Sequence, residues 1–234
     1  MTAAEIITEL KKLADAQTKK TMMRHGAHEP CLGVKIADMK KIVQRIKMDY
    51  QLALDLYDTG IADAMYLAGL IADDAKMTKK DLQKWVENAN SPWVAEYAVP
   101  WVASASPHGR ELALKWMKSK NETIAAAGWQ TYSSLVAIKP DEDLDLAEIK
   151  SLLQQVAKSI HDERNKVKYM MNGFVIAIAC YVKPLHKLAV DTAKAIGEVK
   201  VDLVGDCTVP SAPDKIKKFA ARSPIGKKRK SAKC

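Results

Sequence analysis

The sequence has little of what β-rich folds, membrane spans and disulfide frameworks need. It contains only two Phe and ten Gly in 234 residues, whereas Ala, Leu, Lys and Met, which favour helices, are plentiful. The longest apolar run, residues 173–182, is shorter than the roughly 18 residues of a membrane-spanning helix. The N-terminus lacks the basic-then-apolar layout of a secretion signal. We therefore expect an all-α protein of the cytoplasm.

Metal and cofactor signatures are also absent. The four cysteines stand at 31, 180, 207 and 234 with no Cys-x-x-Cys pair, so free thiols in a reducing compartment are expected. His25, His28 and Cys31 are spaced three apart, but a fourth metal ligand is lacking and Gly and Pro make this segment a loop. There is no glycine-rich phosphate loop and no Ser-His-Asp order. We expect no metal and no cofactor.

Acidic residues are missing from the C-terminal stretch 215–234, which contains nine Lys and Arg. The formal net charge is +9, so the other 28 basic residues match the 28 acidic ones and the excess charge lies in this stretch. Basic tails are usually solvated arms that find polyanions, although such a tail can also act only in solubility. We predict a single helical-repeat domain over 1–207 and a basic C-terminal tail over 208–234.

The apolar spacing is helical nearly throughout. A first amphipathic helix is expected over 5–19, a loop over 25–33 and an acidic linker over 140–145. Several helix starts carry N-cap residues or Pro at the first helical position, as at Ser91-Pro92 and Ser106-Pro107. The remaining helices are expected over 36–47, 52–57, from Thr78, from Asn121, over 146–160, over 165–182 and over 184–196.

The helices recur as pairs. The longer member of each pair is expected to begin near Ile61, Trp93, Ile124 and Val167, at intervals of 32, 31 and 43 residues. A period of helix pairs in this range is typical of an α-solenoid. Pro100 falls inside one of these helices, where it should distort the backbone. We therefore predict a HEAT-repeat-like α-solenoid of antiparallel helix pairs, with an irregular helical bundle as the alternative.

Basic residues concentrate in two further segments. Residues 19–47 contain eight basic and two acidic side chains, and residues 164–187 contain five basic and none acidic. A neutral domain can thus still present a positive concave face to a duplex. No helix shows the pattern of a major-groove recognition helix, so contacts to the DNA backbone rather than to base edges are expected.

Short motifs between about residues 8 and 196 resemble a known family. They are Cys31-Leu-Gly-Val-Lys before a basic helix, Leu82-x-x-Trp85-Val86 followed by Asn90-Ser91-Pro92-Trp93, Trp116-x-x-Ser119-x-Asn121, and Gly173-Phe174. Their order and spacing resemble the AlkD-type DNA alkylation repair proteins. That resemblance implies a HEAT-like solenoid that binds DNA, and some members are glycosylases that excise cationic N-alkylated purines. It also implies association with the nucleoid if the protein is bacterial.

The resemblance gives catalytic expectations residue by residue. Active members use a Trp-x-x-x-Asp on one helix, an Arg on the next repeat and a late Trp. In this sequence these positions fall on Trp93 and Tyr97, near Ala126, and on Phe174. The carboxylate and the phosphate-holding Arg are thus replaced by a phenol and a methyl group. Glycosylase activity is therefore in doubt, unless Glu96, one residue from the expected position, acts as the catalytic carboxylate.

Three functions remain open. The first is a DNA-binding protein without efficient excision, the second an alkylpurine glycosylase that uses Glu96, and the third a helical scaffold that binds other proteins. For DNA binding we expect a monomer, sequence-non-specific duplex as the ligand, and no membrane partner. The expected DNA-contacting residues are Trp93, Tyr97, Phe174, Lys35, Lys40, Lys41, Arg164, Lys166, Lys168, Lys227, Lys228, Arg229 and Lys230.

Overall fold

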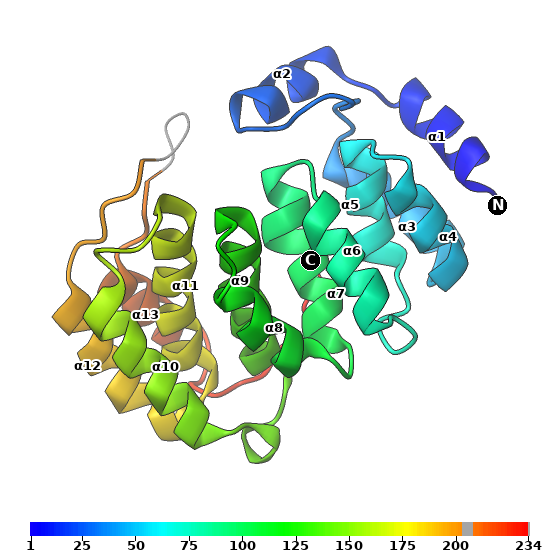
Figure 1. Cartoon of the computed structure of the whole chain (residues 1–234). Coiled ribbons are helices and arrows are strands. Elements are labelled where there is room, and N and C mark those ends of the chain that lie inside the picture. The colour runs from blue at the N-terminus through cyan, green and yellow to red at the C-terminus, as the bar shows by residue number, and fades with distance from the viewer. Residues whose placement is uncertain (203–207, 234) are drawn as a thin grey trace. The chain divides into compact units, whose positions relative to one another are not determined.

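A computed structural model describes residues 1–202 and 208–233 (Figure 1). The chain forms two compact units. Unit 1 comprises Met1–His108 together with Lys233, whose ammonium group donates to the Ala72 carbonyl at 2.7 Å and pairs with Asp74 at 2.8 Å. Unit 2 comprises Gly109–Ala232. Within the described residues the only β-type pairing is an isolated bridge between Ala14 and Val34.

Unit 1 is built of seven α-helices and one π-helical turn. Its elements are α1 (Ala3–Lys12), α2 (Ala16–Arg24), α3 (Ile36–Ile46), α4 (Tyr50–Asp58), α5 (Ala62–Ile71), α6 (Lys79–Asn88), η1 (Val94–Ala98) and α7 (Val99–Ala105). Every residue of α5 is buried, and α5 packs against α4 and η1. Helix α5 is therefore the central helix of this unit.

Unit 2 contains the remaining helices that the structure describes. They are α8 (Gly109–Met117), α9 (Glu122–Ile138), η2 (Asp141–Asp143), α10 (Leu146–Ser159), α11 (Asn165–Tyr181), η3 (Lys183–Leu185), α12 (His186–Ile196) and α13 (Ala212–Ala220). Helices α9, α11 and α13 pack in that order, while α8 contacts α9 and both α10 and α12 lie against α11. Unit 2 therefore has two layers of helices, as in a HEAT-like repeat, one with α9, α11 and α13 and the other with α8, α10 and α12.

The predicted fold class is confirmed. The second helices of the pairs begin at Ala62, Val94, Glu122 and Asn165, each within two residues of its predicted start. Most residues of these helices are buried, because each packs against other helices of its own unit. The helix starts predicted at Thr78 and Asn121 are present, with side-chain oxygens accepting from Asp81 N and from Thr123 N and Ile124 N. The N-cap predicted at Ser91 is absent, because the Ser91 hydroxyl is buried and has no hydrogen-bond partner among the described residues.

The prediction of one helix over 5–19 was wrong. The chain instead forms α1 and α2, which are separated at Leu13–Asp15. The Asp15 side chain accepts from the Thr18 backbone N at 2.7 Å and so starts a new helix, an N-cap that the apolar spacing did not reveal. The Ala14–Val34 bridge lies at the same break. Helix α2 therefore takes its own direction.

Pro100 has the distorting effect expected of it. The turn before it, η1, is π-helical, and the Val99 N–H donates to the Val94 carbonyl five residues back. Pro100 has no N–H, and in a regular helix its ring would clash with the carbonyl of Glu96. Widening the turn relieves that clash, and short π-helical turns of this kind are frequent at functional sites. Glu96 and Tyr97 both lie in this turn.

Helices α8 and α9 approach each other closely at Gly128. A Cβ atom added there would lie 2.5 Å from Met117 N and 2.8 Å from the Ala113 carbonyl oxygen, both of them backbone atoms. Only glycine fits at such a distance. Gly173 on α11 has nothing within 4 Å of the corresponding position. Gly128 is thus required by packing, whereas Gly173 is not.

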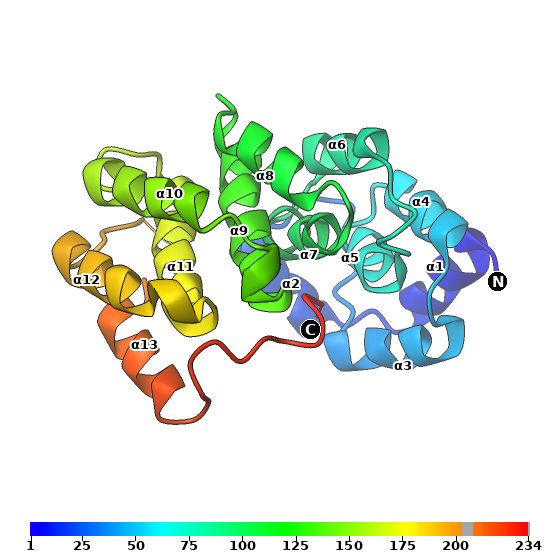
Figure 2. The ribbon, with the colours of Figure 1, turned by 90° about the horizontal axis from the view of Figure 1, so that it is seen from below.

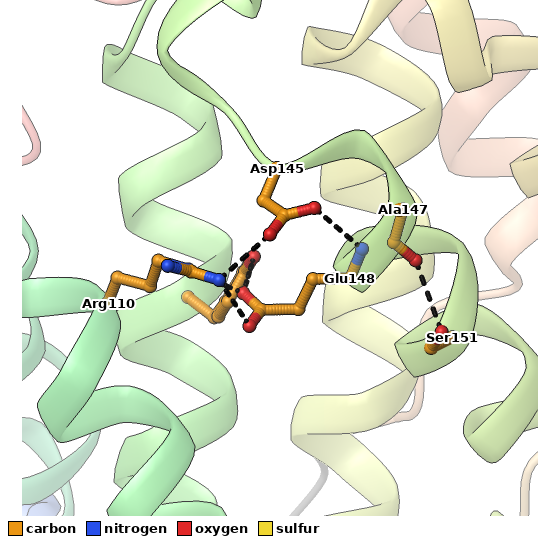
Figure 3. A network of polar contacts seen from close by, with 6 residues as sticks. Arg110, Asp145, Ala147, Glu148 and Ser151 are labelled. Carbon is orange, nitrogen blue, oxygen red and sulfur yellow. Dashed lines mark hydrogen bonds and ion pairs between the residues drawn. The ribbon is translucent and has the colours of Figure 1, made fainter.

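A polar network joins α8, α9 and α10 at the surface of unit 2 (Figure 3). The Arg110 guanidinium donates to both carboxylate oxygens of Glu148, at 2.9 and 2.8 Å, and to Asp145 at 2.9 Å. Asp145 also caps α10, and the Tyr132 hydroxyl donates to Glu148 at 2.6 Å. The neighbouring carboxylates raise the pKa of Arg110, with the hydrogen bond to Glu148 as the main cause. These side chains therefore serve to hold α8, α9 and α10 together.

No single helix in 1–202 or 208–233 is long and apolar enough to cross a membrane. The pair Asn165–Tyr181 and Lys183–Ile196 reaches that length and composition only together, and it is bent by 112°.

Candidate nucleic-acid interface

Trp93 stands at the entrance to η1 and is half-buried. It packs against a small cluster formed by Ala27, Cys31 and Ala62, together with Met22. Its indole N–H is shielded from solvent and has no hydrogen-bond partner among the described residues. The Trp93 ring therefore helps to pack the 25–33 loop against α5.

Tyr97 lies in the π-helical turn and is 38% exposed. Its ring lies 6.0 Å from that of buried Trp101, tilted by 49°, and Trp101 in turn contacts Tyr66 edge-on at 5.7 Å. An anchored, partly exposed aromatic ring is suited to stacking on a base or sugar. Glu96, which precedes it, is half-buried and is engaged in contacts within the protein.

Phe174 does not reach the surface. It is fully buried, with its ring edge-on to Trp129 at 5.2 Å and to Tyr132 at 5.8 Å. The prediction that Phe174 contacts DNA is not compatible with this packing, and the residue belongs to the core of unit 2. Ala126, where the resemblance places a phosphate-holding Arg, is also fully buried. Helix α9 contains no Lys or Arg.

The basic residues of α3 remain at the surface of unit 1. Lys35, Lys40 and Lys41 are all exposed. Lys35 lies 3.7 Å from Asp15, and Lys41 forms an ion pair with Asp38 at 2.8 Å. Such exposed pairs contribute roughly 0–1 kcal/mol and exchange readily for a phosphate. Lys40 has no charged partner in the part of the chain that the structure describes.

A buried carboxylate fixes the start of α3. Asp63 is 0% exposed and accepts from the backbone N–H groups of Leu32 at 2.6 Å, Val34 at 2.7 Å and Gly33 at 3.4 Å. The loop before α3 is thereby held to the first turn of α5. Sequence reasoning missed this residue, since an Asp at a helix start is usually read as a cap or a surface charge.

The basic residues of α11 have two different roles. Arg164 donates through Nη1 to the carbonyls of Ser119 and Lys120, at 3.0 and 2.8 Å, so its guanidinium closes the turn after α8. Lys166 and Lys168 are half-exposed, with no ion-pair partner among the described residues. Arg164 is thus mainly structural, whereas the two lysines stay available to a ligand.

The C-terminal segment is docked on unit 2 over 224–232, contrary to the expectation of a solvated arm. Its backbone N–H groups donate to the ends of two long helices, Gly226 to the Cys180 carbonyl of α11 at 2.9 Å and Arg229 to the Ala137 carbonyl of α9 at 2.8 Å. The Lys228 ammonium group donates to the Val136 carbonyl at 2.9 Å. The last carbonyls of a helix lack intrahelical partners, and this segment supplies them.

Lys228 is therefore an anchor. Its side chain is 19% exposed and also pairs with Asp141 at 2.8 Å. The prediction that Lys228 contacts DNA does not fit this position, because its ammonium group is mostly buried and already has two partners, Val136 and Asp141. Lys227, Arg229 and Lys230 are exposed, and they stay candidates for contact with phosphate.

Sequence reasoning also missed α13, which lies within the predicted tail. Ser211 caps it by accepting from Asp214 N, and Pro213 lies in its first turn. Both signals were present in the sequence, but the basic composition suggested an unstructured arm. The boundary predicted between 207 and 208 stays a prediction, and α13 packs on the core of unit 2.

Two of the four cysteines, Cys31 and Cys180, lie in the described part of the chain and are buried free thiols. Within the described ranges no three or more His, Cys, Asp or Glu side chains are grouped so that they could hold a metal ion. Burial raises the pKa of the Cys31 and Cys180 thiols to about 11 each. Cys207 and Cys234 lie outside the described residues.

Comparisons with known proteins agree on the relatives of this chain. A family model described as "DNA alkylation repair enzyme" matches residues 6–215. "Uncharacterized protein Lin0241" of Listeria innocua is 31% identical over 95% of this chain and 99% of its own length, and "Uncharacterized protein Lmo0209" of Listeria monocytogenes is 30% identical with the same coverage. A solved structure reported as "A new family of proteins related to the HEAT-like repeat DNA glycosylases with affinity for branched DNA structures" superposes with a TM-score of 0.91, at 35% identity and over 100% of both chains.

Proposed function

Because the chain belongs to the DNA alkylation repair enzyme family, we propose that it binds duplex and branched DNA through the sugar-phosphate backbone and does not excise alkylated bases efficiently. The observation that carries the proposal is Tyr97. A partly exposed phenol stands in the π-helical turn, where the resemblance places the carboxylate of active glycosylases.

Base excision needs stabilisation of positive charge that develops on the sugar. A carboxylate at close range supplies it, and a neutral phenol does so far less well. Removal of one such electrostatic group typically costs on the order of 10²–10³ in rate. Glu96 is the nearest carboxylate in sequence, but successive residues of a helical turn point in different directions. The protein's own contacts also hold Glu96.

The second catalytic element has no substitute on its helix. Ala126 is fully buried and α9 has no basic residue, so no guanidinium can hold the phosphate from that position. Loss of this positioning lowers the rate further. The two losses are coupled and need not be additive. Without the carboxylate and the Arg, the protein can still bind DNA but does not excise bases efficiently.

The remaining surface supports binding to the DNA backbone. Lys40, Lys166 and Lys168 have no charged partner among the residues described, and Tyr97 offers an anchored ring. Phosphate contacts give affinity without sequence information. An exposed aromatic ring favours DNA in which a base is unstacked, as at a branch point. The related solved structure is reported with affinity for branched DNA, which supports the same ligand here.

The binding half of the proposal is tested by titrating the protein into a labelled four-way junction and into a linear duplex of the same sequence, at two salt concentrations. We expect binding to both, tighter to the junction, with affinity falling steeply as salt rises. A scrambled sequence should bind equally well. If neither DNA binds at low salt, the proposal fails and the protein-binding scaffold becomes the better reading.

The catalytic half is tested by single-turnover release of 7-methylguanine from methylated duplex. Wild type, Glu96→Gln and Tyr97→Asp are compared at saturating protein. We expect release near the uncatalysed rate for wild type and for Glu96→Gln. Activity gained by Tyr97→Asp would support the assignment of this position. Robust excision by wild type that Glu96→Gln abolishes would identify Glu96 as the catalytic carboxylate and refute the proposal.

A further inference from the structure

We propose that α13 and the exposed lysines that follow it form a fixed binding face for the phosphate backbone of duplex DNA. We call Lys217, Lys218, Arg222, Lys227 and Lys230 the α13 face. The inference rests on the proposed function and goes beyond it, because it places a DNA contact on a helix outside the predicted repeats.

Helix α13 is held firmly enough to present a defined surface. Ala212 and Ile216 are buried in the core of unit 2, and the Phe219 ring lies edge-on to Tyr181 at 5.2 Å. These residues are spaced at i, i+4 and i+7, so they form one helical stripe. Contacts to α11 and α12 fix that stripe (Figure 2). The helix is therefore not a loose arm that orders only on binding.

The exposed residues of α13 and of the turn after it are mainly basic, with Asp214 as the one acidic residue of the helix. Lys217, Lys218 and Arg222 are all exposed, and none has an acidic partner in the part of the chain that the structure describes. Many basic residues elsewhere are paired, for example Lys19 with Glu29 at 2.7 Å and Lys187 with Asp191 at 2.7 Å. The three basic side chains outnumber the one exposed carboxylate of α13, Asp214, so this surface keeps a net positive charge that a bound polyanion would neutralise.

The docked segment extends the same charge. The chain turns at Gly226, whose φ is +84° and whose amide is held by the Cys180 carbonyl. Because Lys228 is anchored, its exposed neighbours Lys227 and Lys230 are held on a backbone of fixed course. Lys228 thus anchors the segment, and Lys227 and Lys230 stay exposed to solvent.

The geometry suits a duplex backbone. Arg222 follows the end of α13 at Ala220, and its backbone N–H donates to the Phe219 carbonyl at 2.9 Å, so it lies about one turn beyond Lys218. Their long side chains can then reach neighbouring phosphates of one strand. Arg222 adds a planar fork that binds a phosphate through two hydrogen bonds. A single phosphorylated residue would engage only part of such a face, so a repeating polyanion is the partner that fits it.

The test compares two triple variants that lose the same charge. The first is Lys217→Gln with Lys218→Gln and Arg222→Gln, and the matched control is Lys118→Gln with Lys150→Gln and Lys158→Gln, three exposed lysines elsewhere in unit 2. Because each phosphate contact contributes about 0.9 to the slope of log affinity against log salt, we expect the α13 variant to lose about 2.7 in slope. The control should keep the wild-type slope, and both should keep the wild-type Tm, since surface substitutions change stability little.

The outcomes separate this inference from the proposed function. If the wild type binds DNA and the α13 variant binds with the same slope, the α13 face is refuted while the proposed function stands. If the two variants lose the same amount of salt slope, binding depends only on the net charge of the protein, and the α13 face is also refuted. If the α13 variant keeps its DNA affinity but loses binding to vesicles of anionic phospholipid, the face serves a lipid surface instead. Failure of the wild type to bind any DNA overturns both proposals.

Discussion

Lys228 gives the sharpest test of how the basic C-terminal segment is used. Lys227, Lys228 and Lys230 lie within four positions and would be equivalent in a solvated arm. In the structure only Lys228 is anchored, by an ion pair with Asp141 at 2.8 Å and a hydrogen bond to the Val136 carbonyl at 2.9 Å. Replacing it with Met keeps the apolar stem and removes every donor.

The expected loss follows from these two contacts. A hydrogen bond from a charged group contributes roughly 1.5–3 kcal/mol. The ion pair adds little, because both partners keep some exposure, 19% for Lys228 and 25% for Asp141. A cation beside the last carbonyls of α9 is also favourable. We therefore expect Lys228→Met to lower the free energy of unfolding by about 2 kcal/mol, which for a chain of this size lowers Tm by roughly 4–8 °C.

The assay is thermal and urea unfolding of three matched variants, Lys228→Met, Lys227→Met and Lys230→Met. The two exposed positions should stay within about 0.5 kcal/mol of wild type. Asp141→Asn should lose less free energy in the Lys228→Met background than alone, because the pair is then already broken. Equal stability of all three lysine variants would show that the segment is not docked, and the reasoning would be refuted.

Other positions give independent checks. Asp63→Asn should lower the free energy of unfolding by about 2–4 kcal/mol, because charge-assisted hydrogen bonds to buried N–H groups are weakened. The control Asp55→Asn, at an exposed position, should change the free energy little. Equal urea midpoints for the two variants would contradict the role of Asp63 in holding the loop before α3. Gly128→Ala should destabilise the protein by about 1–3 kcal/mol through overpacking against α8, whereas Gly173→Ala should stabilise it by about 0.5–1 kcal/mol through helix propensity. Differential scanning calorimetry measures the two changes in Tm, and changes of the same sign would contradict the packing argument. Burial raises the pKa of Cys31 and Cys180 to about 11, so only about one of these thiols in a thousand is ionised at pH 8. A variant that keeps only these two cysteines, Cys207→Ser with Cys234→Ser, should therefore show no fast reaction with a thiol reagent until urea unfolds it.

The fold could be predicted where one physical signal dominated. Apolar spacing located the second helices of the pairs within two residues, because those helices are buried on most sides. It failed at α1 and α2, where a single cap, Asp15, divides one amphipathic pattern into two helices. It also failed at α13, since the same lysines fit a solvated arm or an exposed helix face.

The candidate site could be predicted only in part, because its residues depend on tertiary contacts. The π-helical turn was anticipated as a distortion at Pro100, but its type was not. Phe174 matched an aromatic pattern, yet the pattern cannot distinguish a ring in a groove from a ring in the core. Arg164 and Lys228 matched a charge pattern, yet both donate to backbone carbonyls that are distant in sequence, in the turn after α8 and at the end of α9. Such partners lie far away in sequence and leave no local signal.

The most direct test of the central claim measures binding and excision on one sample. A labelled duplex carrying 7-methylguanine is incubated with enough protein to saturate it, and the bound fraction and the abasic sites are measured in the same tube over time. The account predicts full binding with base release at the rate of free methylated duplex, since the resemblance to active glycosylases puts Tyr97 and Ala126 where those enzymes have the catalytic carboxylate and Arg. Release well above that rate from the saturated complex, or no binding at low salt, would contradict it.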